Sequence, residues 1–227
     1  MVKLNIVGVG PGSVDYVSPL VHRLVFSAQI VIGAKRCLDL FSPELSCETH
    51  VLTAKDLCVL LKYAVESAKS GKSVVVLSTG DPGFSGLLKS VLNTGLISSA
   101  DINVVPGVSA VQVCAARLGL CWDELCLFTF HQGNVTDARK AELVACLKAG
   151  RSVLLFPDAK SFLPRDIALY LIDSGFDSNL SVFICENLTL SNERVVESSL
   201  GNVSTGDFAA LCVMVIKVTC EVVDGKW

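Results

Sequence analysis

Short apolar runs alternate with longer helical patterns over the first half of the chain. Apolar residues at helical spacing predict helices over 55–70, 84–94 and 109–118, the first of them ending at Gly71. The runs between them are continuously apolar, which is typical of strands covered on both faces of a sheet. These predicted strands are 3–8, 29–32, 73–78 and 102–105. The pattern up to about residue 115 therefore predicts an α/β unit with a mainly parallel sheet.

The pattern changes in the second half, where strand-like runs outnumber helical ones. The last strands follow one another through turns such as Leu-Ser-Asn-Glu, with no helix expected between them. This order favours an α+β or mixed sheet with antiparallel pairs. The predicted strands are 125–130, 152–156, 181–185, 194–197 and 210–218, and the predicted helices are 137–148 and 163–173. A domain boundary near 117–124 would divide the chain into 1–117 and 118–227.

Composition narrows the class of protein. The chain has 227 residues, of which 51% are hydrophobic and 18% charged, so a sizeable core is expected and disorder is not. Its apolar runs are too short to span a bilayer and its start lacks a signal-peptide pattern, which favours a soluble cytoplasmic protein without a membrane partner. A net charge of −3 without a basic stripe argues against binding of nucleic acid.

The ten cysteines show no C-x-x-C pair and no metal-ligand spacing, so no metal site is expected. Many of them lie inside apolar runs, where cysteine behaves as a small hydrophobic residue in a reducing compartment. The cysteines predicted to be buried on this ground are Cys58, Cys114, Cys146, Cys185 and Cys212.

A glycine-rich turn, Val-Gly-Val-Gly-Pro-Gly-Ser, follows the first predicted strand at 7–13. A dinucleotide site would need G-x-G-x-x-G with a helix beginning inside the motif. Here the best helix start is Ser18 as N-cap with Pro19 as the first helical residue. Lys35 and Arg36 stand where an acidic ribose ligand would be expected. An adenine dinucleotide, and with it a dinucleotide-dependent oxidoreductase, is therefore disfavoured. The glycines indicate close approach of the backbone to a flat ligand or to another backbone.

Two further glycine turns follow predicted strands, Ser-Thr-Gly-Asp-Pro-Gly-Phe-Ser-Gly at 78–86 and Val-Pro-Gly-Val-Ser-Ala at 105–110. Ligands bind at the carboxyl ends of strands in open α/β sheets. Three such turns would line one rim of the sheet with backbone amides and carbonyls and with the carboxylate of Asp81. The alternative is that they are ordinary tight turns, with Asp81 as a turn residue and Ser109 as a helix cap.

The three turns, together with Arg-Leu-Gly-Leu-Cys-Trp-Asp-Glu at 117–124, resemble the tetrapyrrole methylase family. This family transfers a methyl group from S-adenosylmethionine (SAM) to carbons of uroporphyrinogen-derived rings. Three stretches of the second half, FHQGN, LFPDAKSFLPRDIALYLIDSGF and ICENLTLSNERVVESSLGNV, resemble its cobalt-precorrin-7 C5-methyltransferase branch. The resemblance covers essentially the whole chain. One departure is 131–134, which reads His-Gln-Gly-Asn where the branch has a His-Gly-Arg-like turn.

The resemblance implies two α/β domains with SAM in the cleft between them, usually in a homodimer. Asp81 and His131 are the candidates for orienting the substrate, and no other catalytic residue is assigned. The residues implied to contact SAM are Pro11, Asp81, Phe84, Ser109, Ala110, Phe156, Pro157, Asn187 and Leu211. The cations that could bind carboxylates of the tetrapyrrole are Lys35, Arg36, Arg117, His131, Arg139, Lys160 and Arg165.

The implied activity is SAM-dependent methylation of C5 of cobalt-precorrin-7 in cobalamin biosynthesis. The sulfonium already activates the methyl group, so alignment is the main requirement and no strong general base is expected. The alternatives are a methylase acting at another ring position and a non-catalytic module that binds a tetrapyrrole or SAM. Because the chain ends at Trp227, a separate decarboxylating C15-methyltransferase is expected as a pathway partner.

Overall fold

The computed structural model describes residues 4–42, 44–131 and 135–218. The chain divides into two compact units, Met1–Ala110 and Val111–Trp227. Helix α5 (Ala110–Arg117) begins at this division, whereas the sequence predicts the boundary at the end of the same helix. Among the described residues, no helix combines the length and the apolar character that crossing a membrane requires.

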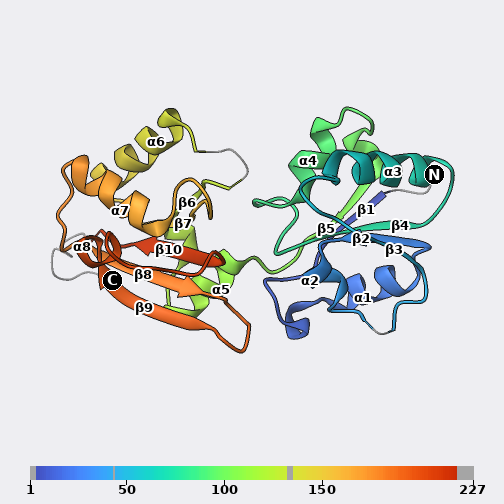
Figure 1. Ribbon diagram of the computed structural model, residues 1–227, viewed down its shortest axis with the longest axis horizontal. Coiled ribbons are helices and arrows are strands. Elements are labelled where there is room, and N and C mark those ends of the chain that lie inside the picture. The colour runs from blue at the N-terminus through green and yellow to red at the C-terminus, as the bar shows by residue number, and fades with distance from the viewer. Residues whose placement is uncertain (1–3, 43, 132–134, 219–227) are drawn as a thin grey trace. The chain divides into compact units, whose positions relative to one another are not determined.

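The first unit is built on a parallel sheet of five strands in the order β3-β2-β4-β1-β5 (Figure 1). Its strands are β1 (Leu4–Gly8), β2 (Ile30–Gly33), β3 (Glu48–Val51), β4 (Val74–Ser78) and β5 (Ile102–Val105). The predicted parallel sheet is therefore confirmed. Strand β3 was not predicted, because it is an exposed edge strand of sequence Glu-Thr-His-Val and has no apolar run.

Helices cover both faces of this sheet, which explains why its strands are continuously apolar (Figure 1). Val75 and Leu77 of β4 pack with the helices on one face, and Val74 and Val76 pack with those on the other. Ser18 caps the first helix by accepting from the Val21 N–H, as predicted. The helices of this unit are α1 (Pro19–Phe26), α2 (Lys35–Leu38), α3 (Leu57–Lys69) and α4 (Leu87–Asn93), with short 3₁₀ turns at Val14–Tyr16 and Ser99–Asp101.

The second unit contains a mixed sheet in the order β6-β7-β10-β8-β9. Only β6 and β7 are parallel, and the other neighbouring pairs are antiparallel, as the sequence predicts. The strands are β6 (Cys126–Thr129), β7 (Val153–Phe156), β8 (Ser181–Glu186), β9 (Arg194–Ser199) and β10 (Cys212–Ile216).

Helices α6 (Asp137–Lys148) and α7 (Pro164–Asp173) cover one face of the mixed sheet, and α5 lies on the other face (Figure 1). A 3₁₀ turn, Trp122–Glu124, follows α5. The expectation of no helix between the last strands is wrong, because α8 (Leu200–Val203) lies between β9 and β10. A single helical turn is too short to produce a recognisable period in the sequence.

The described cysteines are all free. Cys114, Cys185 and Cys212 are buried, as predicted. Cys146 is only partly buried, and Cys58 is exposed because it lies on the outer side of α3. The burial predicted for Cys58 is therefore wrong, since an apolar run around a helix does not place every member on its inner face.

Candidate functional site

Three glycine-rich loops leave the first sheet from the same edge. Loop 1 (9–13), loop 2 (79–86) and loop 3 (106–109) follow β1, β4 and β5, and β1 lies between the other two in a parallel sheet. Gly10 and Gly80 form an isolated β-bridge in which the Gly80 N–H donates to the Gly10 carbonyl at 2.8 Å. The predicted grouping of the three turns on one rim is confirmed.

The glycines allow these loops to pack backbone against backbone. A Cβ added to Gly8 would lie 2.5 Å from the Gly107 nitrogen and 2.5 Å from the Gly80 oxygen. A Cβ added to Gly107 would lie 2.4 Å from the Gly80 oxygen. Such separations are far below van der Waals contact, so no side chain fits at Gly8 or Gly107. The glycine turns were expected to approach either a flat ligand or another backbone. At Gly8 and Gly107 the backbone approaches another backbone.

Asp81 joins loop 2 to loop 3. Its Oδ1 accepts from the Gly83 N–H at 2.7 Å, which is the turn role left open by the sequence. Its Oδ2 accepts from the Gly107 N–H at 3.1 Å, across to the neighbouring loop. Both carboxylate oxygens are thus engaged with backbone amides, and Asp81 holds the geometry of the rim.

Replacing Asp81 by alanine is expected to destabilise the protein by about 1–2 kcal/mol, because two backbone amides lose a charged acceptor. Urea unfolding followed by circular dichroism measures this change. Asp123→Ala is the matched control, since Asp123 is exposed on a 3₁₀ turn. Equal stability of the two variants would show that the Asp81 bridge does not stabilise the loops.

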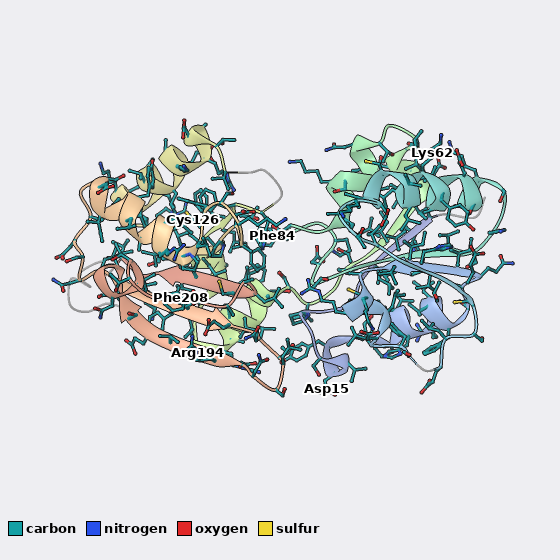
Figure 2. The ribbon with its side chains drawn as sticks, in the orientation of Figure 1. Asp15, Lys62, Phe84, Cys126, Arg194 and Phe208 are labelled. Atoms are coloured by element: carbon teal, nitrogen blue, oxygen red, sulfur yellow. The ribbon has the colours of Figure 1, made fainter. Side chains whose placement is uncertain are left out.

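The residues of the first unit that were predicted to bind SAM all lie on these loops or directly after them. Pro11 follows Gly10 in loop 1, and Phe84 lies in loop 2 (Figure 2). Ser109 is buried at the end of loop 3 and is followed by Ala110, the first residue of α5. The five predicted positions, Asp81 included, are therefore brought to one rim.

The predicted residues of the second unit also gather at one edge of their own sheet. Strand β10 is antiparallel to both β7 and β8, so it begins where these two strands end. Phe156 and Pro157 stand at the end of β7, Asn187 follows β8, and Leu211 precedes β10. The Asn187 N–H donates to the Leu211 carbonyl at 2.9 Å, and the His131 and Phe156 ring centroids lie 5.4 Å apart. Residues 132–134, where the chain departs from the His-Gly-Arg-like turn, lie outside the described residues.

Glu186 is a buried carboxylate that the sequence analysis did not single out. It accepts from the Ala209 N–H at 2.5 Å and from Arg194 Nε, whose side chain is on β9 (Figure 2). Burial alone would raise the pKa of Glu186, but the hydrogen bonds from Arg194 and Ala209 and the charge of Arg194 bring it below its ordinary value. Glu186 therefore fixes the segment that leads to Leu211. The sequence did contain a signal for this residue, because Glu186 is the charged last residue of the otherwise mainly apolar run Ser-Val-Phe-Ile-Cys-Glu.

The structure distinguishes among the cations proposed from the sequence. Four of them have carboxylate partners within 4.0 Å: Lys35 with Asp39, Arg117 with Glu193, Arg139 with Glu142 and Arg165 with Asp166. Arg36 instead donates to the Thr79 hydroxyl, at 3.1 Å. Thr79 is the first residue of loop 2, so Arg36 stands beside the glycine rim. Within the described part of the chain, no carboxylate forms an ion pair with Arg36.

The fold of the chain is that of several solved methyltransferases. The structure of the methyltransferase CobJ superimposes with a TM-score of 0.82 at 17% identity, covering 96% of this chain and 95% of the other. Uroporphyrin-III C-methyltransferase from Thermus thermophilus, solved in complex with S-adenyl homocysteine, has a TM-score of 0.73 at 19% identity, with coverage of 95% and 97%.

The sequence has closer relatives. A probable cobalt-precorrin-7 C(5)-methyltransferase of Methanocaldococcus jannaschii is 33% identical over 93% of this chain and 96% of its own length. The cobalt-precorrin-7 C(5)-methyltransferase of Salmonella typhimurium is 32% identical, with coverage of 85% and 88%. A precorrin-6Y C(5,15)-methyltransferase [decarboxylating] of Sinorhizobium is 31% identical over 96% of this chain but only 50% of its own length. Residues 3–204 match the family model for tetrapyrrole (corrin/porphyrin) methylases. The chain belongs to the tetrapyrrole methylase family.

Proposed function

We propose that the protein is a cytoplasmic SAM-dependent methyltransferase that methylates C5 of cobalt-precorrin-7 in cobalamin biosynthesis. The observation that carries this proposal is the extent of the match to relatives named for this reaction. The Methanocaldococcus jannaschii relative, for example, is 33% identical, and the match covers 93% of this chain and 96% of that relative. A relationship limited to the fold would not select this ring position.

SAM binds, in this proposal, through the rim of the first sheet and the edge of the second. In the first unit the contacts are made by Pro11, Asp81, Phe84, Ser109 and Ala110. In the second unit they are made by Phe156, Pro157, Asn187 and Leu211. The three glycine loops support this role, because backbone amides and carbonyls at the carboxyl ends of parallel strands are the common ligand-binding groups of α/β sheets. The complex of the Thermus neighbour with S-adenyl homocysteine supports the choice of ligand.

Methyl transfer requires the nucleophilic ring carbon to lie in line with the sulfonium methyl. Alignment of two reactants in this way can lower the barrier by about 7–11 kcal/mol. Asp81 contributes by holding loops 2 and 3 together, since both of its oxygens accept from amides. His131, next to the Phe156 ring, is the candidate for orienting the substrate.

Arg36 is the cation that we assign to a carboxylate of the tetrapyrrole. Thr79 holds its guanidinium beside loop 2, and Arg36 keeps further N–H donors for a bidentate contact. Arg36→Ala should raise the KM for cobalt-precorrin-7 about tenfold or more and leave the KM for SAM nearly unchanged. Lys35→Ala is the control, because Lys35 is its neighbour but pairs with Asp39 at 2.8 Å. An unchanged KM for the tetrapyrrole in Arg36→Ala would remove Arg36 from the substrate site.

Two measurements test the proposed function itself. Titration calorimetry should show micromolar binding of SAM or S-adenosylhomocysteine and no binding of NAD(P). Transfer of a labelled methyl group from SAM to cobalt-precorrin-7, with the new methyl located by NMR, should place it on C5. Binding without transfer would identify a non-catalytic module, and a methyl at another carbon would identify a different methylase of the family.

The same proposal includes a homodimer and a separate decarboxylating C15-methyltransferase. The Sinorhizobium relative supports the separate partner, because its name joins C5 and C15 chemistry and this chain matches half of its length. Sedimentation of the purified protein tests the dimer. Accumulation of a C5-methylated product that a C15-methyltransferase then consumes tests the order of the two enzymes.

A further inference from the structure

The loop between β8 and β9, residues 187–193, has an unfavourable backbone conformation. Asn187 has φ +50° and Thr189 has φ +70°, both in the left-handed region. This region is rare for residues other than glycine, and for a β-branched residue such as threonine it is strongly disfavoured. Such a conformation persists only where the surrounding structure holds it, and it is common where a loop binds a ligand.

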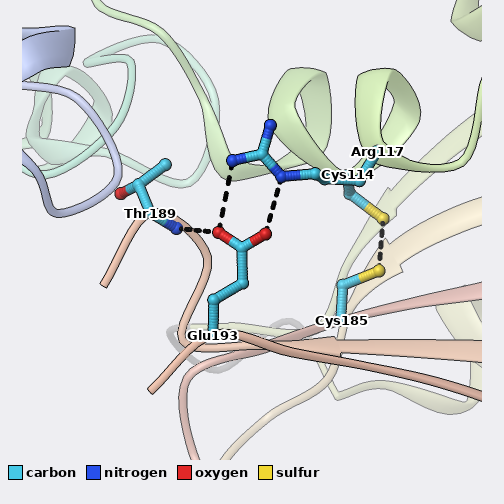
Figure 3. A network of polar contacts seen from close by, with 5 residues as sticks. All are labelled: Cys114, Arg117, Cys185, Thr189 and Glu193. Atoms are coloured by element: carbon cyan, nitrogen blue, oxygen red, sulfur yellow. Dashed lines mark hydrogen bonds and ion pairs between the residues drawn. The ribbon is translucent and has the colours of Figure 1, made fainter. Parts of the chain in front are cut away.

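Glu193 is the residue that holds this loop. Its carboxylate accepts from the Thr189 N–H at 2.6 Å and from Arg117 through Nε at 2.6 Å and Nη2 at 3.4 Å (Figure 3). Inside the loop, the Leu190 N–H donates to the Asn187 carbonyl at 2.9 Å. The hydrogen bond from Arg117 lowers the pKa of Glu193 below its ordinary value, so the carboxylate is charged at neutral pH. Thr189, which has the left-handed backbone, is thus connected through the Glu193 carboxylate to Arg117 at the end of α5.

Helix α5 is itself fixed against the sheet. Cys114, one turn before Arg117, is buried with its Sγ 3.3 Å from the Sγ of Cys185 on β8 (Figure 3). Cys185 lies two residues before Asn187, so the helix that carries Arg117 packs beside the start of the loop. Arg117 therefore reaches Glu193 from a rigid support, at a sequence separation of 76 residues.

We propose that Arg117 and Glu193 are positioning residues that hold loop 187–193 in its left-handed conformation and thereby place Asn187 to bind SAM. This inference rests on the proposed function. It removes Arg117 from the candidates for substrate carboxylates, because two of its guanidinium nitrogens already contact Glu193. Asn187 is the link to the ligand edge, since its N–H donates to the carbonyl of Leu211, another of the SAM contacts proposed at that edge.

Calorimetry and steady-state kinetics on the full chain test the role in binding. Glu193→Ala should weaken binding of S-adenosylhomocysteine about tenfold and raise the KM for SAM similarly, with kcat within about twofold. Glu193→Gln should lie between this variant and the wild type, because its amide oxygen still accepts from Thr189. Glu197→Ala, an exposed glutamate on β9, should match the wild type. A fall in kcat at unchanged KM, or wild-type affinity in Glu193→Ala, would overturn the inference.

Hydrogen exchange without ligand tests the effect on the loop directly. Amides in 187–193 should exchange faster in Glu193→Ala and in Arg117→Lys than in the wild type or in Glu197→Ala. If Glu193→Ala does not fold, Glu193→Gln and Arg117→Lys decide both tests. Unchanged exchange would overturn the positioning role alone. Failure of the wild type to bind SAM or S-adenosylhomocysteine would instead overturn the proposed function.

Discussion

Replacing Gly107 by alanine is expected to destabilise the first unit by about 3 kcal/mol and to abolish SAM binding. The new Cβ would lie 2.4 Å from the Gly80 oxygen and 2.6 Å from the Gly8 carbonyl carbon. Backbone atoms cannot turn aside as a flexible side chain can, so the strands or their loops must separate, and overpacking of this kind is costly. Urea unfolding and calorimetry with S-adenosylhomocysteine measure the two effects.

Gly80→Ala is the matched control for this prediction. Gly80 lies in the same group of loops and has φ +63°, but a Cβ there would meet nothing closer than 3.7 Å. The alanine variant should therefore lose only about 1–2 kcal/mol through its left-handed backbone. If Gly80→Ala were as unstable as Gly107→Ala, backbone packing between the loops would not be the reason for glycine at position 107.

Replacing Glu186 by alanine is expected to destabilise the second unit by about 2–3 kcal/mol. Glu186 is 2% exposed, and its loss leaves the Ala209 N–H without its acceptor and Arg194 without its carboxylate. Thermal unfolding measures the change, and Glu124→Ala, at an exposed position, is the control. A shift no larger than that of the control would mean that the Glu186 contacts contribute nothing to stability.

Glu186 also makes the stability of this unit depend on pH. Because its pKa is lowered in the folded state, its contribution is fully present above the ordinary glutamate pKa of about 4.3. The contribution is lost as the pH falls from that value through the lowered folded one. The hydrogen bond from Arg117 also lowers the pKa of Glu193, so the stability that Glu193 contributes is likewise lost as the pH falls. Wild-type stability should therefore fall on acidification below about pH 5, and Glu186→Gln should lose less over the same interval.

Much of the architecture follows from local pattern. Continuous apolar runs predicted strands that are buried on both faces, and helices do cover both faces of the first sheet. Ser18 and Pro19 predicted the start of α1 beyond the glycine turn. The exposed strand β3 and the single-turn helix α8 were missed, because neither has a hydrophobic period that marks it. Proximity of the three glycine turns was predictable, since carboxyl ends of parallel strands share an edge.

The sequence by itself determined the parallel sheet, the rim of three turns and the family that these motifs resemble. Only the tertiary structure decided what the motif residues contact. Gly8 packs against Gly107, which is 99 positions away in the chain. Asp81 accepts from Gly107, 26 positions away, and Arg117 donates to Glu193, 76 positions away. Local propensity carries no information on contacts of that range, because they depend on which strands become neighbours and on the register in which they pair.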